Sequence, residues 1–600
     1  MVSISDRKEG VGIMSFMLLL SPGQVSENIA TAIGTYPRLF QYITAFTRYA
    51  LLILALFVVM GCAVSLLRGK HDRELWGYVS MPDGTKQAIE HWENVIGRSK
   101  RSDIVLNYPT VSRNHAALMR NSDSTWSITD LRSKMGTTVN RRKVKGTAPV
   151  KSGDLIDLGG VKLVLLPAAK KEQEEVRRHR RVPGLLVNPA LILFWLTEFQ
   201  IFACVQLILS KYEDFTWYLP GVFLALIFIM WTWYFVFRAL RRRGFELDTL
   251  AFFLSTIGLV VMASLSPAGL FKQFCAVLLG LLVFVILGWC LRDLDLVKKL
   301  RWPAAIATIL LLAVTLVFGK TLNGAKNWIN IGGISLQLSE LAKVSFIFAG
   351  SATLERLYAR RNMLLFIVLA GACVMALALQ GDYGTALIFF VTFLIIAFLR
   401  SGDLASIAFI AAAAVFGAFL VIRAKPYIAS RFSAWRHVWE YSAGLGYQQT
   451  RTMSAAASGG LFGLGIGEGW LKRIGAASTD LVFGILCEEM GLLLALTAVS
   501  AVLILAVFTF KSASAGRSSY YVIAACAAAC LMVFQMSLNV FGAVDILPLT
   551  GVTFPFVSTG GSSMVACWAL LAFLKAADTR QNASFAIRLE HRPKKGSDAA

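Results

Sequence analysis

Charged residues are scarce in this sequence of 600 residues. They account for 16% of the chain, whereas hydrophobic residues account for 56%, and the mean hydropathy is +0.62. A soluble globular domain carries far more polar surface, so the composition excludes an ordinary soluble enzyme and indicates a polytopic membrane protein. A helix that crosses a bilayer needs about 20 apolar residues, and runs of this kind recur along most of the chain.

The motifs of nucleotide-driven and metal-dependent enzymes are missing. The sequence contains no Walker A stretch and no HExxH pattern, and its six histidines show no metal-ligand spacing in the membrane half. ATP-driven transport and a histidine-based metal site are therefore not supported. The nine cysteines form no CxxC pair and all lie in apolar runs, which is typical of small packing residues rather than of a disulfide framework.

The net charge of +23 is concentrated in short basic clusters beside the apolar runs. Clusters in these places orient helices in the membrane and meet anionic headgroups. We therefore expect no nucleic-acid partner.

Hydropathy divides the first 240 residues into membrane and soluble parts. An N-terminal segment (1–48), interfacial in part, precedes a first span over 49–67. The hydropathy then falls sharply. Short runs in which apolar and polar residues alternate, separated by Gly, Asn, Asp and Ser, predict a small β-sandwich over 72–168. A charged helical linker is expected over 169–186, and two more spans are expected within 187–240.

The segment 245–580 predicts ten further spans. A long polar loop at 423–479 interrupts them, a continuous span over 481–510 follows the loop, and a basic tail occupies 581–600. The expected fold is an all-α polytopic membrane protein with a ten-helix core, three extra N-terminal spans and a small all-β domain.

Basic clusters also predict on which side of the membrane each loop lies. They occur at 241–243, 292–301, 355–361 and 591–595, and such clusters mark the cytoplasmic side. The β-sandwich then lies in the cytoplasm and the long loop lies outside. That loop carries seven cations against two acidic residues, which favours an anionic ligand; contact with outer-leaflet headgroups is the alternative.

Several polar side chains lie where lipid should begin. "GAKNWINIGGISLQLSELAK" is typical of a re-entrant or interfacial segment, and it ends in Glu340 and Lys343, three apart on one helix face. At membrane depth these two groups neutralise each other or line a wet cavity. "QGDYGTAL" places Asp382 at another outer helix end, and "STDLVFGILCEEMG" places Asp480 at the entrance of an apolar run.

Two neighbouring stretches complete this set. The Gly-rich segment "SGGLFGLGIGEG" (458–469) is either a phosphate cradle or a flexible loop. "LPLTGVTFPFVSTGGSS" predicts irregular backbone, which is tolerated at membrane depth where it is buried or faces a cavity. Glu488 and Glu489, eight and nine residues after Asp480, are interpreted as packing or polar-network groups facing the bundle interior.

In order and spacing, these five segments resemble the signature segments of the SEDS family, which contains FtsW, RodA and their sporulation homologue. The resemblance implies a peptidoglycan glycosyltransferase that polymerises lipid II at the outer face of the bacterial cytoplasmic (inner) membrane. It also implies a class B penicillin-binding protein transpeptidase as partner, and a role in division, elongation or sporulation. A lipid II flippase and a catalytically idle division scaffold are the alternatives.

The resemblance makes Asp480 the catalytic residue, with Ser478 where the family usually has histidine. Chemically, a sugar hydroxyl needs a base to take its proton before it can attack an anomeric carbon. Loop cations or a divalent ion, Mg²⁺ or Mn²⁺, would stabilise the departing pyrophosphate; no other cofactor is expected. The supporting cavity residues are Glu340, Lys343 and Asp382, and the pyrophosphate candidates are Arg431, Arg436, Lys472 and Arg473.

The soluble insert resembles a forkhead-associated (FHA) domain. Its "GR", "SRNH" and "SKMGTTVN" blocks follow one another between Gly97 and Arg141. The resemblance implies binding of a phosphothreonine protein marked by a Ser/Thr kinase, with a spacer role as the alternative. Met135 stands where the family usually has asparagine. The implied phosphopeptide contacts are Arg98, Ser112, Arg113 and Lys134.

Overall fold

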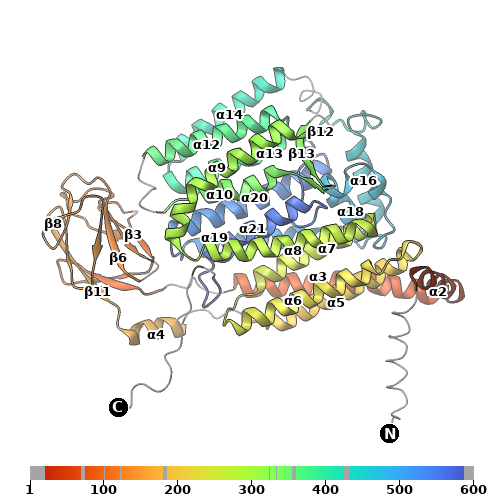
Figure 1. Cartoon of the computed structure of the whole chain (residues 1–600), viewed down its shortest axis with the longest axis horizontal. Helices are drawn as coiled ribbons and strands as arrows, with labels where there is room; N and C mark the ends of the chain where they lie inside the picture. Colours follow the sequence, from red (N-terminus) through yellow and green to blue (C-terminus); the bar gives the residue numbers. More distant parts are fainter. Residues whose placement is uncertain are drawn as a thin grey trace, which may run out of the picture.

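The computed structural model describes residues 21–68, 74–100, 102–121, 124–179, 186–322, 325–332, 334–353, 360–424, 432–584 and 586. Long helices lie side by side, and a β-sandwich sits at one end of the bundle (Figure 1). Ten helices among these residues are long and apolar enough to cross a membrane. The predicted class, a multi-pass helical membrane protein with a separate β-sandwich, is confirmed.

The ten candidate spans are α3 (Pro37–Leu67), α5 (Pro189–Ser210), α6 (Tyr218–Ala239), α7 (Glu246–Leu265), α8 (Pro267–Cys290), α9 (Leu294–Phe318), α12 (Arg360–Leu379), α13 (Tyr383–Ser401), α19 (Leu492–Ala513) and α20 (Ser519–Ala543). The other helices are α2 (Pro22–Thr35), α4 (Lys170–His179), α10 (Leu338–Gly350), α14 (Leu404–Ala424), α16 (Tyr447–Gly459), α17 (Ala477–Asp480), α18 (Val482–Glu489) and α21 (Gly561–Ala577), with the 3-10 turns η1 (Tyr212–Asp214) and η2 (Leu471–Arg473).

The helix bounds differ from the sequence prediction in informative ways. α3 begins at Pro37, well before the predicted span 49–67, because proline at a first helical position favours helix entry there. α10 has only 13 residues and α21 only 17, so both are shorter than a typical span. The segment before α10 forms a small antiparallel sheet of β12 (Lys320–Leu322), β13 (Ala325–Ile331) and β14 (Ile334–Leu336).

The centre of the bundle is formed by α7 and α21. In the 18-residue apolar stretch that makes α7 a candidate span, 94% of the residues are buried. α21 packs against α8, α10 and α20. By contrast, only 17% and 22% of the residues in the corresponding stretches of α9 and α12 are buried, so most residues of these two helices keep exposed surface. The extra N-terminal helices are joined to this core, because α3 packs against α5, α7 and α19.

The soluble domain is a sandwich of two sheets. One has the strand order β2-β1-β11-β10-β7-β8, and the other has the order β4-β3-β5-β6-β9. Alternate residues of both sheets, such as Ile96, Leu118, Ile156 and Leu163, are fully buried between them. The strands are β1 (Gly77–Ser80), β2 (Lys86–Ile89), β3 (Glu93–Gly97), β4 (Ile104–Val105), β5 (Ala116–Arg120), β6 (Trp126–Asp130), β7 (Thr137–Val139), β8 (Arg142–Lys143), β9 (Thr147–Val150), β10 (Leu155–Leu158) and β11 (Val161–Pro167).

The sandwich docks on the turn between α19 and α20. Arg517 in this turn donates from Nε and Nη2 to the Glu74 carboxylate, at 2.9 and 3.0 Å, and both side chains are buried. The Trp92 amide donates to the Arg517 carbonyl at 2.7 Å, and the Ser519 amide donates to Glu93 Oε2 at 3.0 Å. β3 begins at the docking contact with Glu93 and ends at Gly97, next to Arg98. The predicted phosphopeptide residues therefore follow the end of β3 that is not docked.

Replacing Arg517 by Met is expected to loosen this docking. Removing one partner of a buried ion pair leaves the other charge uncompensated, which costs about 3–5 kcal/mol. Hydrogen exchange measures the effect directly, because the Trp92 and Ser519 amides are bonded across the interface. We expect both to exchange faster in Arg517→Met, while Arg243→Met, at an exposed arginine of the same end, leaves them protected. Equal protection in both variants would contradict this role of Arg517.

Candidate functional site

Asp480 lies at the end of a short helix where the chain changes direction. Ala476 precedes α17 with a left-handed φ of +61°, and only Leu481 separates Asp480 from the start of α18. α18 ends at Glu489, and Gly491, with a φ of +87°, turns the chain into α19. The prediction of one continuous span over 481–510 is wrong, because this glycine ends the first helix and allows a new helix to begin.

The backbone beside Asp480 is held by α20 and by the irregular stretch after it. Asn539 Nδ2 donates to the carbonyls of Asp480 and Val552, at 3.0 and 2.7 Å. Ser558 Oγ donates to the carbonyl of Thr479 at 2.6 Å. The peptide groups that carry the carboxylate are therefore fixed by side chains from two other segments.

Ser478 joins the same contact. Thr559 donates to it twice, from its amide to the Ser478 carbonyl at 3.0 Å and from Oγ1 to Ser478 Oγ at 2.8 Å. Gly551 passes so near the carboxylate that an added Cβ would lie 3.4 Å from Asp480 Oδ2. The Pro-, Gly- and Ser-rich stretch thus forms one wall of the site, as irregular backbone at membrane depth is expected to do.

Glu340 and Lys343 form a buried ion pair on α10, with Nζ 2.8 Å from the carboxylate. Lys343 Nζ also donates to Gln535 Oε1 of α20 at 2.8 Å. Gln535 Nε2 in turn donates to Thr553 Oγ1 at 2.7 Å, and Thr553 Oγ1 lies 2.9 Å from Ser563 Oγ. The pair is therefore connected by hydrogen bonds to the same irregular stretch that holds the backbone of Asp480.

Asp382 caps the start of α13 and fastens the small sheet before α10. Its Oδ1 accepts the Thr385 amide at 3.1 Å, and its Oδ2 accepts from Asn327 and Gln337 at 3.1 and 3.3 Å. The backbone amide of Gln337 donates to Ser562 Oγ at 3.2 Å. Ser562 is the neighbour of Ser563, whose hydroxyl contacts Thr553. Asp382 is thus linked to the Glu340–Lys343 pair through intermediate side chains, without a direct bond between them among the described residues.

The four loop cations are placed differently from one another. Arg436 and Arg473 are exposed, and the Arg436 guanidinium lies 5.5 Å from the Trp435 ring. Lys472 is instead half-buried and paired with Glu489 at 3.4 Å, and burial lowers the pKa of its ammonium group. Arg431 lies outside the described residues. Arg436 and Arg473 are therefore better placed than Lys472 to meet an anionic ligand.

The Gly-rich segment is tied to α18 through its amides. Leu464 and Gly465 donate to the carbonyls of Glu488 and Glu489, at 2.8 and 2.9 Å, and the Gly467 amide donates to Glu489 Oε2 at 3.0 Å. The Glu488 carboxylate accepts two further amides, at 2.8 and 3.0 Å. These amides are already bonded, so the phosphate-cradle hypothesis is not supported, and both glutamates act as buried polar-network groups.

Gln535 and Asn539 are the site residues that the sequence analysis missed. They are four residues apart on α20, in "FQMSLNVFGA", and so lie on one face of an otherwise apolar helix. Two amides at this spacing inside a span are a usable signal, because polar groups at membrane depth face the bundle interior and find partners there.

The described residues around Asp480 do not form a protein cage for a metal. No group of three His, Cys, Asp or Glu side chains with ligand geometry occurs in the part of the chain that the structure describes. A divalent ion held by protein ligands alone therefore does not fit this donor set.

The predicted phosphopeptide residues gather at the loops beyond β3. The Arg98 amide donates to the Ser112 carbonyl at 3.0 Å, and Ser112 Oγ accepts the Lys134 amide at 3.0 Å. His115 fixes the Ser112 loop, because its Nδ1 accepts the Ser112 amide at 3.1 Å. Arg98, Arg113 and Lys134 are exposed there, so three cationic side chains lie on the loops that meet at Ser112.

A close approach of two loops explains the glycine beside Arg98. A Cβ at Gly97 would lie 2.2 Å from the Arg113 carbonyl, so no other residue fits without displacing the backbone. Met135 is 65% exposed beside these loops.

Comparison with known proteins finds a matching family for the membrane core and another for the soluble domain. The family model described as cell cycle protein, which covers FtsW, RodA and SpoVE, matches residues 246–583, and the FHA domain model matches residues 94–159. The probable peptidoglycan glycosyltransferase FtsW of Borreliella burgdorferi is 32% identical over 294 residues, 46% of this chain and 78% of that protein. The protein of the same name from Tolumonas auensis is 32% identical over 372 residues, 58% of this chain and 95% of that protein.

Among solved structures, the rod shape determining protein RodA of Thermus thermophilus is 26% identical, covers 55% of this chain and 95% of its own, and has a TM-score of 0.40. The family match covers more than half of the 600 residues and begins with α7. The chain belongs to the family of FtsW, RodA and SpoVE, with an FHA domain inserted ahead of the family region.

Proposed function

We propose that this chain is a peptidoglycan glycosyltransferase that joins lipid II units into glycan strands. The observation that carries the proposal is the placement of Asp480, whose backbone is fixed by Asn539 and Ser558 beside the wall formed by Gly551. Relatives of similar sequence bear the name probable peptidoglycan glycosyltransferase FtsW, and a carboxylate placed in this way would supply the base that such a reaction needs.

In the proposed reaction, the hydroxyl of one sugar attacks the anomeric carbon of another. The bond to the lipid pyrophosphate breaks, the pyrophosphate leaves with the electron pair, and the hydroxyl proton passes to the Asp480 carboxylate. Arg436 and Arg473, exposed in the same loop region, would stabilise the negative charge that develops on the leaving group. Because the described donors do not fit a metal cage, no step of this reaction is assigned to a metal.

The ends of the bundle support the proposed orientation in the cytoplasmic membrane. The FHA domain sits at one end of the bundle, and α16 and α18 lie at the other end (Figure 1). The basic clusters favour a cytoplasmic position for the FHA end, and Asp480 would then lie at the outer face, where the proposed polymerisation of lipid II takes place. We propose a class B penicillin-binding protein transpeptidase as the partner there, in cell division, elongation or sporulation.

Polymerisation by the purified chain tests this function. Given labelled lipid II in detergent, the full-length protein is expected to form long glycan strands with no other polymerase present. A protein that moves labelled lipid II across a vesicle bilayer but forms no polymer would be a flippase, and one that does neither would be a scaffold. Both results would overturn the proposal.

We further propose that the FHA domain binds a phosphothreonine segment of a protein marked by a Ser/Thr kinase. Arg98 and Ser112 are joined by a backbone hydrogen bond, and Lys134 bonds Ser112 Oγ from the other side. A phosphate placed among these residues would receive charge-assisted hydrogen bonds, which are the stronger kind. The site lies away from the docking contact of Arg517, so a peptide reaches it without undocking of the domain.

Replacing Arg98 by Ala is expected to weaken phosphothreonine-peptide binding by at least tenfold, because a charge-assisted hydrogen bond contributes about 1.5–3 kcal/mol. Calorimetry with the full-length protein and a phosphothreonine peptide library measures this loss. Lys86→Ala, at an exposed lysine on the edge strand β2 of the other sheet, provides a matched control and should bind normally. Binding that is unchanged in Arg98→Ala, or absent in the unmodified protein, would contradict the phosphopeptide role.

A further inference from the structure

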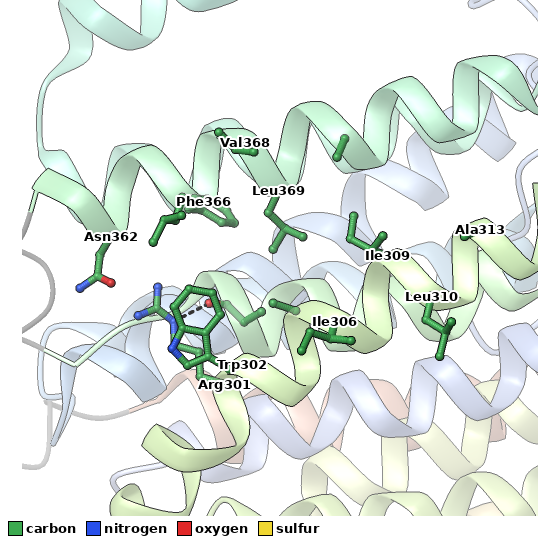
Figure 2. Close-up of a pocket in the computed structure, with 14 residues that line it drawn as sticks. Arg301, Trp302, Ile306, Ile309, Leu310, Ala313, Asn362, Phe366, Val368 and Leu369 are labelled. Atoms are coloured by element: carbon green, nitrogen blue, oxygen red, sulfur yellow. Dashed lines mark hydrogen bonds between the residues drawn. The ribbon is translucent and has the colours of Figure 1, made fainter.

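An apolar groove runs along the outside of the bundle between α9 and α12. Its volume is about 480 Å³, and its walls are mostly aliphatic, including Ile306, Ile309, Leu310 and Val368. Figure 2 shows these side chains lining the space between the two helices, with Arg301, Trp302 and Asn362 together at one end. The groove is separate from Asp480 and from the FHA domain.

The walls of the groove face the surroundings of the protein rather than its core. Ile306 is 65% exposed and Val368 is 67% exposed, and both belong to candidate spans. In a membrane, this surface lies at the depth of lipid tails. A long apolar channel at that depth has the dimensions and chemistry to receive an acyl chain.

Two cations bind adjacent carbonyls near the polar end of the groove, Arg301 within its lining and Arg400 outside it. Arg301 Nε donates to the Ala349 carbonyl at 2.9 Å, and Arg400 Nη1 donates to the Gly350 carbonyl at 3.1 Å. Both carbonyls belong to the C-terminal turn of α10, whose dipole attracts positive charge. Phe366 lies between Arg400 and the groove, with the guanidinium 5.4 Å from its ring.

Arg400 has more donors than acceptors around it. Its side chain is only 8% exposed, and its Nε and Nη2 have no hydrogen-bond partner within the described parts of the chain. A buried guanidinium with unused donors is costly, so a site of this kind favours a nearby anion. The charge of Arg301 adds to the same local field.

The polar end also lies at the level of lipid headgroups. Trp302 is 54% exposed there, and tryptophan and arginine together are typical of the membrane interface. Tyr520 lies in the first turn of α20, three residues after Arg517 of the docking turn. Its hydroxyl donates to the carbonyl of Phe348, the residue before Ala349, at 3.2 Å. The headgroup end of the groove is thus the end on which the FHA domain docks.

We propose that this groove binds an anionic phospholipid of the leaflet on the FHA side. The phosphate lies at the end formed by Arg301, Trp302 and Asn362, and Arg400 contributes its charge from behind Phe366. One acyl chain extends between α9 and α12. Basic pockets between spans are suited to anionic headgroups in this way, and the proposal does not depend on the reaction at the other end of the bundle.

Lipid retention by the full-length protein tests the site. Native mass spectrometry is performed with dioleoyl phosphatidylglycerol, dioleoyl phosphatidylcholine, or inorganic phosphate alone. The wild type is expected to retain the anionic lipid in preference to the zwitterionic one. Arg301→Gln should weaken that preference about fivefold, equivalent to roughly 1 kcal/mol for one interfacial cation. Lys299→Gln, at an exposed lysine of the same helix outside the groove, should leave it unchanged.

A steric variant tests the acyl-chain part of the site independently of charge. Ile306→Trp fills the groove and should reduce retention of phosphatidylglycerol at least fivefold. Ile286→Trp, at a position that is 51% exposed on α8 and outside the groove, should not. Thermal unfolding of each variant in lipid-free detergent confirms that the fold is kept.

Three outcomes would overturn the proposal. Equal retention of both lipids would remove the anionic site, and retention of inorganic phosphate alone at the same strength would remove the acyl chain from it. A dimer of this chain that is dispersed by Ile306→Trp, with no lipid retained, would assign the groove to a second copy.

Discussion

Replacing Asp480 by Asn is expected to lower the rate of glycan polymerisation by about 10²–10⁴-fold, the usual contribution of a positioned general base. Asparagine has the same shape but cannot take the hydroxyl proton. The backbone of this segment is held through the carbonyls of Thr479 and Asp480, which accept from Ser558 and Asn539. These bonds do not involve the carboxylate, so the variant should fold normally and lose only chemistry.

The measurement is the initial rate of strand formation from labelled lipid II by the purified full-length protein. Glu440→Gln is the matched control, because Glu440 is an exposed carboxylate in the same loop region, paired with His437 at 3.2 Å. It should polymerise at the wild-type rate. An Asp480→Asn variant that retains more than a tenth of that rate would show that another group acts as the base.

Much of the architecture was predictable because it follows from local properties of the sequence. The apolar runs that became α5, α6 and α7 could be placed by length alone, the strands of the β-sandwich by their alternating pattern, and the FHA resemblance by the "GR", "SRNH" and "SKMGTTVN" blocks. The position of Asp480 was also predictable, since a carboxylate at the edge of an apolar run needs a functional or structural partner.

What escaped prediction depends on contacts between distant segments. Nothing in the sequence near Arg517 indicates that it pairs with Glu74, more than 400 residues away in the chain, at 2.9 Å. The break at Gly491 was missed because the apolar run resumes directly after "EEMG", whereas in the structure α18 ends at Glu489 and Gly491, with a φ of +87°, turns the chain into α19. Similarly, the bonding of the Gly-rich amides to Glu488 and Glu489 is set by packing and not by composition.

The ion pair between Glu340 and Lys343 provides the second large effect. Lys343→Met leaves the Glu340 carboxylate buried without a counter-ion and removes the donor to Gln535 Oε1. The loss of one partner from a buried pair costs about 3–5 kcal/mol. We therefore expect a clear decrease in the thermal unfolding temperature of the purified protein in detergent, together with loss of polymerisation.

The double variant Glu340→Gln with Lys343→Met separates a structural role from a chemical one. Removing both charges eliminates the uncompensated carboxylate, and a neutral replacement of a buried pair is often as stable as the original. If the pair only maintains the hydrogen bonds through Gln535 and Thr553 to the wall of the site, most of the stability and a rate within about tenfold of wild type should return. A double variant that is stable but inactive would instead place the pair in contact with substrate, because its charges would then matter after folding had been restored.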